Sequence, residues 1–254
     1  MTTKPLKAVY CYYFPEVRKI IDEVSSNYPH ETFLQSINPG LDNFHEGTIN
    51  AYIKHFKFEL PDLPRFPFHY IAGGASESIF HLLSYLKAHE PKTPLYVLRG
   101  EYEGYAGYGS NLGLSFQIIP DLANLLTLPK GILFLSNPSA RDGNIIPDSE
   151  VISIADFGHR IVYDLTYVGL TDHHQFETNH PNIIAVIVSL SKPFGLYYYR
   201  VGFAFTRFEI KTLEVNKWFK NIHSLIVAEK ILKQLDSKKL VARYRKLQKK
   251  LLRR

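Results

Sequence analysis

The sequence predicts an α/β protein of three layers, in which a mostly parallel, seven-stranded sheet lies between two layers of helices. Two observations support this prediction. Short apolar runs of strand length alternate along the chain with segments whose apolar residues recur at helical spacing. Glycine or polar residues directly follow several of the apolar runs, as they do where ligands bind at the carboxyl ends of parallel strands.

The strands are predicted from short runs of apolar and β-branched residues, at 67–71, 95–98, 114–119, 131–136, 160–164, 184–189 and 201–206. The longest run, around 183–190, is typical of a strand that is buried on both faces. Helices are predicted from apolar residues three and four apart, at 75–89, 102–112, 148–157 and 210–236. We divide the chain into an N-terminal arm with a helix at 16–26 (1–40), a large domain (41–208) and a C-terminal helical segment (209–254).

The composition is that of a folded globular protein, with 254 residues, 45% hydrophobic residues and only 15 glycines and 15 prolines. Cys11 is the only cysteine, which excludes an intrachain disulfide framework and predicts a reducing, cytoplasmic location. The apolar runs are too short to span a membrane and the N-terminus has no signal-peptide core, so we expect no membrane partner. The 11 histidines show no spacing typical of a metal site, so we expect no metal.

The net charge of +6 comes from the C-terminal tail. Residues 237–254 contain nine Lys and Arg and no Asp or Glu, so the rest of the chain is net negative. Apolar tail residues at helical spacing predict an amphipathic basic helix, namely Leu240, Tyr244, Leu247 and Leu251. Such a helix could bind nucleic acid or an anionic membrane. We favour a helix that packs its apolar face on this chain or a second subunit, and expect no nucleic-acid partner.

The strongest chemical signal is the turn that contains Lys192, directly after the strand at 184–189. A lysine at the rim of a sheet is partly desolvated, which favours the neutral amine that can form a Schiff base with an aldehyde. Arg200 follows eight residues later, and its planar guanidinium suits a phosphate. Together they suggest pyridoxal 5′-phosphate (PLP). The alternative is a solvated lysine and an arginine in an ordinary ion pair.

A second signal is Asp164, which ends the strand predicted at 160–164, with Tyr167 three residues later. A PLP ring withdraws electrons only while its pyridine nitrogen is protonated, and a buried carboxylate can hold that proton. Tyr167 could donate a hydrogen bond to the phenolate oxygen of the ring. The alternative is a strand-end aspartate that caps a turn.

Two further motifs follow predicted strands. Gly73, Gly74 and Ser76 open the helix at 75–89, where free N–H groups favour an anion, although Ser76 could be a simple helix cap. Tyr102 and Tyr105 are three residues apart, and one of these rings could stack on the pyridine ring. Ordinary surface tyrosines are the alternative in a chain that has 17 tyrosines.

In this order and spacing the motifs resemble the fold-type I PLP-dependent enzymes of the class I and II aminotransferase family. They are Gly-Ala-Ser-Glu at 74–77, Tyr-x-x-Tyr at 102–105, Ser-Asn-Pro at 136–138 with Gly143, Asp-x-x-Tyr at 164–167, and Ser-x-Ser-Lys at 189–192 with Arg200. Gly-Ala-Ser-Glu-Ser-Ile-Phe and Ile-Asn-Pro-Gly at 37–40 are most similar to histidinol-phosphate aminotransferase and threonine-phosphate decarboxylase. The resemblance covers roughly residues 36–236.

The resemblance implies a role for each matching position. Lys192 would hold PLP as a Schiff base and move protons at the substrate α-carbon, Asp164 would pair with the ring nitrogen, and Tyr167 would contact the ring oxygen. These three are the predicted catalytic residues. The other predicted cofactor-binding residues are Tyr102, which would stack on the ring, Ala75, Ser76, Ser189 and Arg200, which would bind the phosphate, and Asn137. Asn38 and Gly40 lie where the family lines its substrate pocket.

Three departures from the family pattern bear on these roles. Ala140 stands where a second asparagine contacts the ring oxygen, and alanine has no donor, so Asn137 would have to compensate. Three consecutive tyrosines, 197–199, fill a stretch that usually has small residues. Only 54 residues follow Arg200, so we expect a truncated C-terminal domain without the family's arginine for the substrate carboxylate.

We therefore predict a PLP-dependent enzyme that acts on a small-molecule amino acid or amine. Transamination is the leading reaction because it is the family's commonest outcome, and a PLP-dependent decarboxylase or lyase is the first alternative. A non-catalytic PLP-fold subunit is the second, favoured by Ala140 and the short C-terminal segment but opposed by the intact lysine, aspartate, tyrosine and arginine. Because fold-type I sites usually form at a dimer interface, we expect a homodimer.

Overall fold

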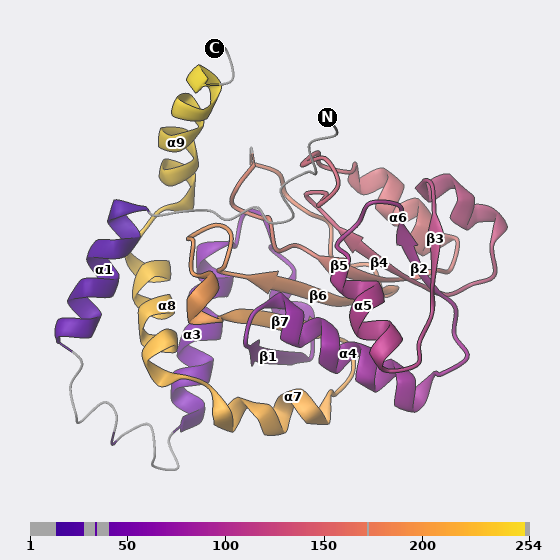
Figure 1. Cartoon of the computed structure of the whole chain (residues 1–254), viewed down its shortest axis with the longest axis horizontal. Coiled ribbons are helices and arrows are strands. Elements are labelled where there is room, and N and C mark those ends of the chain that lie inside the picture. Colours follow the sequence, from indigo (N-terminus) through magenta and orange to yellow (C-terminus); the bar gives the residue numbers. More distant parts are fainter. Residues whose placement is uncertain (1–13, 28–33, 35–40, 172, 252–254) are drawn as a thin grey trace, which may run out of the picture.

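The computed structural model describes residues 14–27, 34, 41–171 and 173–251. Its centre is one seven-stranded sheet in the order β1-β7-β6-β5-β4-β2-β3 (Figure 1). The seven predicted strands are all present, as β1 (Phe68–Ala72), β2 (Leu95–Leu98), β3 (Phe116–Ile119), β4 (Ile132–Ser136), β5 (Arg160–Asp164), β6 (Ile183–Ser189) and β7 (Gly202–Thr206). The predicted mostly parallel sheet is confirmed, since only β7 runs opposite to the others.

Helices cover both faces of this sheet, as the three-layer prediction requires (Figure 1). One face packs against α4 (Ala75–His89), α5 (Gly104–Asn111) and α7 (Lys211–Asn216). The other packs against α3 (Leu41–His55), α6 (Asp148–Asp156) and α8 (Ile222–Gln234), with α1 (Pro15–Ser26) outside α8. Successive strand residues alternate between the two layers, so Ile132 and Phe134 of β4 face the first group while Leu133 and Leu135 face the second.

The helix predicted at 210–236 is interrupted, which corrects the sequence-based assignment. The chain forms α7, a short 3-10 turn (Lys217–Phe219) and then α8. Lys220 is extended between them, and Asn221 caps α8 by accepting a hydrogen bond from the Ser224 N–H at 3.1 Å. The break places Lys220 against Glu77 on α4, with distances of 2.8 and 2.7 Å from its Nζ to the two carboxylate oxygens.

The prediction also lacks α3. Its buried face mixes apolar side chains with His45 and Thr48, which are 5% and 0% exposed. Polar residues on the buried face conceal the apolar periodicity by which an amphipathic helix is recognised in sequence.

The predicted basic tail helix is present as α9 (Ser237–Leu251), which extends away from the sheet layers (Figure 1). Leu240 is buried, the Tyr244 ring lies 5.0 Å from that of Phe14, and the Tyr244 hydroxyl donates to Glu16 at 3.0 Å. The first half of the helix therefore packs on this chain.

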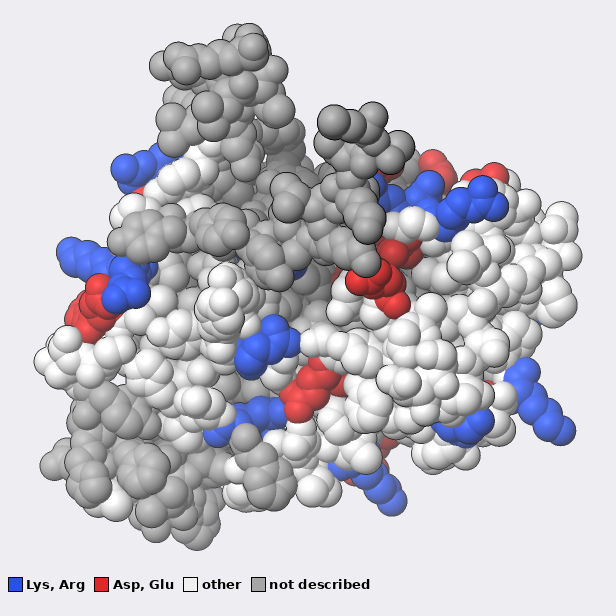
Figure 2. All heavy atoms as spheres, in the orientation of Figure 1, with Lys and Arg blue, Asp and Glu red and all other residues white. Residues whose placement is uncertain are grey.

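Charged side chains of both signs are scattered over the face shown in Figure 2, between larger uncharged areas. Within the part of the chain that the structure describes, no helix combines the length and the apolar character needed to cross a membrane.

Candidate cofactor site

A cavity of about 250 Å³, called here the cofactor cavity, lies at the edge of the sheet where β1, β5 and β6 end and β7 begins. Its walls bring together eight of the nine predicted cofactor-binding residues, namely Ala75, Ser76, Tyr102, Asp164, Tyr167, Ser189, Lys192 and Arg200. The antiparallel strand β7 explains this assembly, because Ala72 and Ser189 both pair with Gly202 at its start. The glycine turn, the lysine turn and Arg200 thus meet at one place.

The ninth residue, Asn137, is not brought to the cavity, contrary to the sequence-based prediction. It is completely buried, and its side-chain NH2 donates to the Ile146 carbonyl at 2.9 Å and to the Tyr163 hydroxyl at 2.6 Å. Its side-chain oxygen accepts from the Ile146 N–H at 3.0 Å. The amide therefore holds the loop after β4 in place, while Ala140 of that loop lines the cavity. The predicted substrate residues Asn38 and Gly40 lie outside the described residues.

Arg200 and the first turn of α4 lie together at the cavity, and this arrangement is called here the anion cradle. Arg200 donates from Nη2 to the Gly73 carbonyl at 2.6 Å and to the Ser76 hydroxyl at 2.8 Å. Gly74 has a φ of +88°, and a Cβ on it would lie 2.5 Å from Arg200 Nη2, so only glycine fits there. The open N–H groups of a helix start beside a guanidinium suit a phosphate in charge and in geometry.

Glu77 fixes the glycine turn of the cradle. Its carboxylate accepts a hydrogen bond from the Gly73 N–H and is held by Lys220, whose side chain is 8% exposed. Burial alone would raise the pKa of Glu77, but the bonds from Lys220 and Gly73 outweigh it and the pKa is lowered. Sequence reasoning missed this pair, since Lys220 lies 143 residues away and only the fold brings it to the turn.

The cavity wall also holds Asp164, which is 6% exposed. The Tyr105 hydroxyl donates to Asp164 Oδ2 at 2.8 Å and the Thr166 N–H donates to Oδ1 at 3.0 Å. Burial raises the pKa of Asp164, while the bonds from Thr166 and Tyr105 act in the opposite direction. Tyr105 was missed as a site residue; its position three residues after Tyr102, at the start of a helix that packs on the sheet, is the signal that could have found it.

Lys192 lines the same cavity, with its Nζ 6.0 Å from the centre of the Tyr167 ring. The turn that carries it is fixed by Ser189, whose Oγ accepts from the Ser191 N–H at 3.1 Å and donates to Ser191 Oγ at 2.9 Å. The Thr166 hydroxyl oxygen, in the same wall, is buried and has no hydrogen-bond partner among the described residues. An amine, a held carboxylate, an anion cradle and an unpartnered hydroxyl in one cavity fit PLP.

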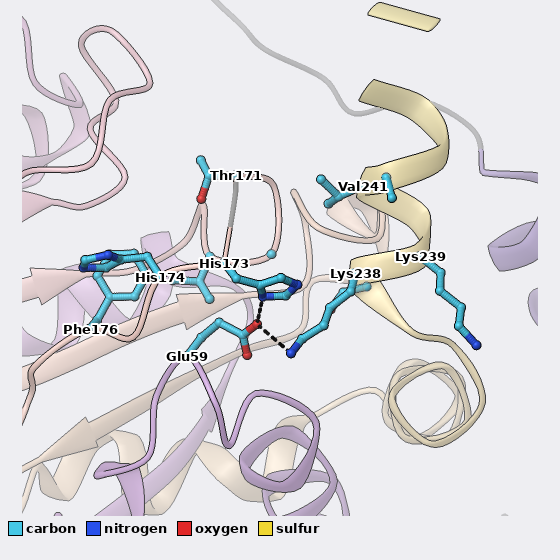
Figure 3. Close-up of a pocket in the computed structure, with 12 residues that line it drawn as sticks. Glu59, Thr171, His173, His174, Phe176, Lys238, Lys239 and Val241 are labelled. Atoms are coloured by element: carbon cyan, nitrogen blue, oxygen red, sulfur yellow. Dashed lines mark hydrogen bonds and ion pairs between the residues drawn. The ribbon is translucent and has the colours of Figure 1, made fainter. Parts of the chain in front are cut away.

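A second cavity, of about 360 Å³, lies between α9 and the loop 168–176, and is called here the tail cavity (Figure 3). His173 and Lys238 point toward Glu59, whose Oε1 is 2.7 Å from His173 Nδ1 and 3.8 Å from Lys238 Nζ (Figure 3). Glu59 Oε2 is buried without a hydrogen-bond partner in the described part of the chain. None of the predicted site residues that the structure describes lies in this cavity.

Solved structures similar to this chain are PLP-fold proteins of greater length. An L-threonine-O-3-phosphate decarboxylase from Porphyromonas gingivalis has a TM-score of 0.68 and 14% identity, covering 95% of this chain and 72% of its own. An aromatic aminotransferase from Pyrococcus horikoshii OT3 has a TM-score of 0.71 and 15% identity, covering 93% of this chain and 69% of its own. A histidinol-phosphate aminotransferase from Sinorhizobium meliloti, solved with PLP, has a TM-score of 0.66 and 17% identity, covering 90% of this chain and 63% of its own.

These TM-scores show that the chain shares the fold of those proteins, and it spans about two thirds of their length. The comparison with curated protein sequences gave no match. The family model for aminotransferase class I and II matches residues 71–246, which include the glycine turn, Asp164, Lys192 and Arg200. The expected likeness and cofactor are thereby confirmed: the chain belongs to the class I and II aminotransferase family, whose members use PLP.

Proposed function

We propose that this chain is a PLP-dependent aminotransferase that acts on an amino acid or amine. The observation that carries the proposal is the meeting of Lys192, Asp164 and the Arg200 cradle in one cavity at the sheet edge. PLP supplies a protonated pyridine ring that withdraws electrons from the α-carbon of a bound substrate. The chain must hold that ring, keep it protonated and move a proton at the α-carbon.

Each task falls to a residue of the cofactor cavity. Arg200 and the N–H groups at the start of α4 would bind the phosphate, and Tyr102 would lie against the ring. Asp164 would hold the proton on the ring nitrogen, and the hydrogen bonds from Tyr105 and Thr166 keep its carboxylate in position. Lys192 would hold the cofactor through its amine and would carry a proton to and from the substrate α-carbon.

Replacing the lysine tests the cofactor assignment. Wild type incubated with PLP and then reduced with borohydride is expected to carry one covalent adduct by mass spectrometry, and Lys192→Ala is expected to carry none. Lys87→Ala is the control, because Lys87 is on the far end of α4 and, among the described residues, its Nζ donates to the Gly113 carbonyl alone, at 3.2 Å. An adduct retained in Lys192→Ala would contradict the assignment.

Decarboxylation or another lyase reaction is the second candidate, because the similar Porphyromonas gingivalis protein is a decarboxylase on the same fold. The residues described above serve all these reactions alike, since the outcome depends on which α-carbon bond the substrate-binding groups hold perpendicular to the ring. Single-turnover mixtures with amino acids separate them. A transaminase converts its PLP to the amine form and releases an oxo acid, whereas a decarboxylase releases CO2 and keeps its PLP. A chain that retains no PLP would favour a non-catalytic subunit.

We further propose a homodimer in the cytoplasm. Tyr102 and Tyr198 are 40% and 82% exposed, and Tyr198 lies against Tyr197 of the cavity wall with ring centres 4.1 Å apart, so a second subunit would cover an aromatic surface. The single Cys11 supports the reducing compartment. Light scattering is expected to give the mass of a dimer for wild type and of a monomer for Tyr198→Arg. A monomeric wild type that binds PLP and turns over substrate would contradict the dimer.

A further inference from the structure

One wall of the cofactor cavity contains a carboxyl and hydroxyl pair that the proposed mechanism does not use. Ser136, the last residue of β4, lines the cavity beside Ala140. Its hydroxyl donates to Glu101 Oε2 at 2.6 Å and its Oγ accepts from the Ala140 N–H at 2.7 Å. Glu101 Oε1 and Oε2 also accept from the N–H groups of Ser136 and Tyr102, both at 3.3 Å.

The pair is set in a charged and largely buried environment. The pKa of Glu101 is raised to about 7, mainly by burial and in smaller part by the charge of Asp164 on β5, while the bonds from Ser136 act in the opposite direction. The other titratable groups that face Glu101 are Tyr105 on α5 and Tyr102 in its own loop. Both the ionised and the protonated form of Glu101 are therefore populated near neutral pH.

The two forms direct the Ser136 hydroxyl differently. A hydroxyl has one hydrogen to donate and two lone pairs that accept. While Glu101 is ionised, it accepts the Ser136 hydrogen. Once Glu101 is protonated it donates to Ser136 Oγ, whose second lone pair is already taken by the Ala140 N–H. The Ser136 hydrogen then has to leave Glu101, and the cavity that Ser136 lines is the open direction.

We propose that Ser136 donates a hydrogen bond to the ring oxygen of the cofactor, at the wall where Ala140 has no donor, and that Glu101 switches this bond on when it takes up a proton. The inference rests on the proposed function, since it requires PLP in this cavity. Ser136 is then a cofactor-binding residue and Glu101 a positioning residue that acts through it.

The test measures binding of 4′-deoxypyridoxine 5′-phosphate, which keeps the phosphate and ring oxygen of PLP but has no aldehyde for Lys192. Dissociation constants by calorimetry at pH 6 and pH 8.5 are compared with wild type at the same pH, so that titration of the probe itself cancels. Ser136→Ala is expected to weaken binding about tenfold at pH 6 and to change it little at pH 8.5. Glu101→Gln cannot titrate, so in that protein Ser136→Ala is expected to change binding by the same factor at both pH values.

Two controls keep the outcomes separate. Ala140→Asn in the Ser136→Ala protein is expected to restore binding at both pH values, because the new amide donates at the same wall. If Ser136→Ala fails to fold, wild type alone decides: the loss caused by removing the ring oxygen from the probe must be larger at pH 6 than at pH 8.5.

A Ser136→Ala effect of equal size at both pH values in the protein that keeps Glu101, or one that still depends on pH in the Glu101→Gln protein, would overturn the inference. In that case the proposed function stands, because the probe still binds. A wild type that does not bind the probe at all would overturn the proposed function instead.

Discussion

The two cavities differ in how their polar groups are supported. In the cofactor cavity, Asp164, Ser136 and Arg200 are each held by at least two hydrogen bonds from strand ends and turns. In the larger tail cavity, Glu59 keeps one buried oxygen without a partner in the described residues, and one wall is the helix α9. Groups that are each fixed by several hydrogen bonds orient a ligand, whereas Glu59 is held through its Oε1 alone among the described residues, by His173 and Lys238. The hydrogen bonds that hold the polar groups in place, and not the volume of the cavity, therefore distinguish the candidate site.

The largest expected difference between the cavities is in turnover. Asp164→Asn is expected to retain PLP but to lose on the order of a thousandfold in rate, because an amide does not hold the ring nitrogen protonated. Glu59→Gln, an equivalent change in the tail cavity, is expected to leave the rate unchanged. Single-turnover rates with an amino donor measure both. Near-normal turnover by Asp164→Asn would show that this carboxylate is structural, and the two cavities would then not differ in their effect on the rate.

Glu101, beside the cofactor cavity, should also make the free energy of unfolding depend on pH. Glu101 has its pKa raised from 4.5 to about 7 by burial, so the folded protein binds this proton more tightly than the unfolded chain. The free energy of unfolding should therefore fall as pH rises through this window, by about 3 kcal/mol in total. Glu101→Gln removes the ionisable group and should flatten that slope, as measured by denaturant unfolding at several pH values. An unchanged slope would show that Glu101 ionises freely in the folded state.

A matched pair of glycine variants tests the rigidity of the anion cradle. Gly74→Ala places a Cβ 2.5 Å from Arg200 Nη2 on a residue with φ +88°, and is expected to lower stability by about 2 kcal/mol and weaken PLP binding. Gly107→Ala, in α5, meets nothing within 4 Å and is expected to raise stability by about 0.5–1 kcal/mol. Thermal melts and PLP titrations distinguish them. Equal effects of the two substitutions on stability and PLP binding would mean that the cradle rearranges to accept the added Cβ.

The smallest expected effect concerns the attachment of the tail. His55 contacts the Leu232 carbonyl at 2.9 Å and Ser237 Oγ at 3.0 Å, and burial lowers its pKa. The unfolded chain therefore binds this proton more readily, and stability is lost as pH falls below about 6.5. His55→Gln should remove this loss without changing PLP affinity, as measured by denaturant unfolding at several pH values and by PLP titration. A change in PLP affinity would show that the tail and the cofactor cavity are coupled.

The sheet and most of the site could be predicted because both follow from local patterns. Buried parallel strands are continuous apolar runs, and residues such as Asp164 that end them meet at one edge of the sheet. The direction of a side chain is not a local property. Asn137 matches its motif by position, yet the loop after β4 turns its amide toward Ile146 and Tyr163.

What could not be predicted depends on contacts between distant segments. The break between α7 and α8 is tied to the bond of Lys220 to Glu77, and α3 presents the polar residues His45 and Thr48 to the core. The helical periodicity of the sequence indicates neither the break between α7 and α8 nor the buried polar residues of α3. The Glu101–Ser136 pair is likewise formed between residues 35 apart, one on the loop after β2 and the other at the end of β4.

The single reversed strand β7 has a consequence for synthesis on the ribosome. Because β1 joins the sheet only through β7, the glycine turn that follows β1 has no fixed neighbour until Thr206 has emerged. The strands β2 to β6, which pair with one another, can assemble earlier. A nascent chain that ends before β7 would therefore contain Asp164, Lys192 and Arg200 without the strand pairing that brings the glycine turn to Arg200, so the anion cradle would form only after β7 is made.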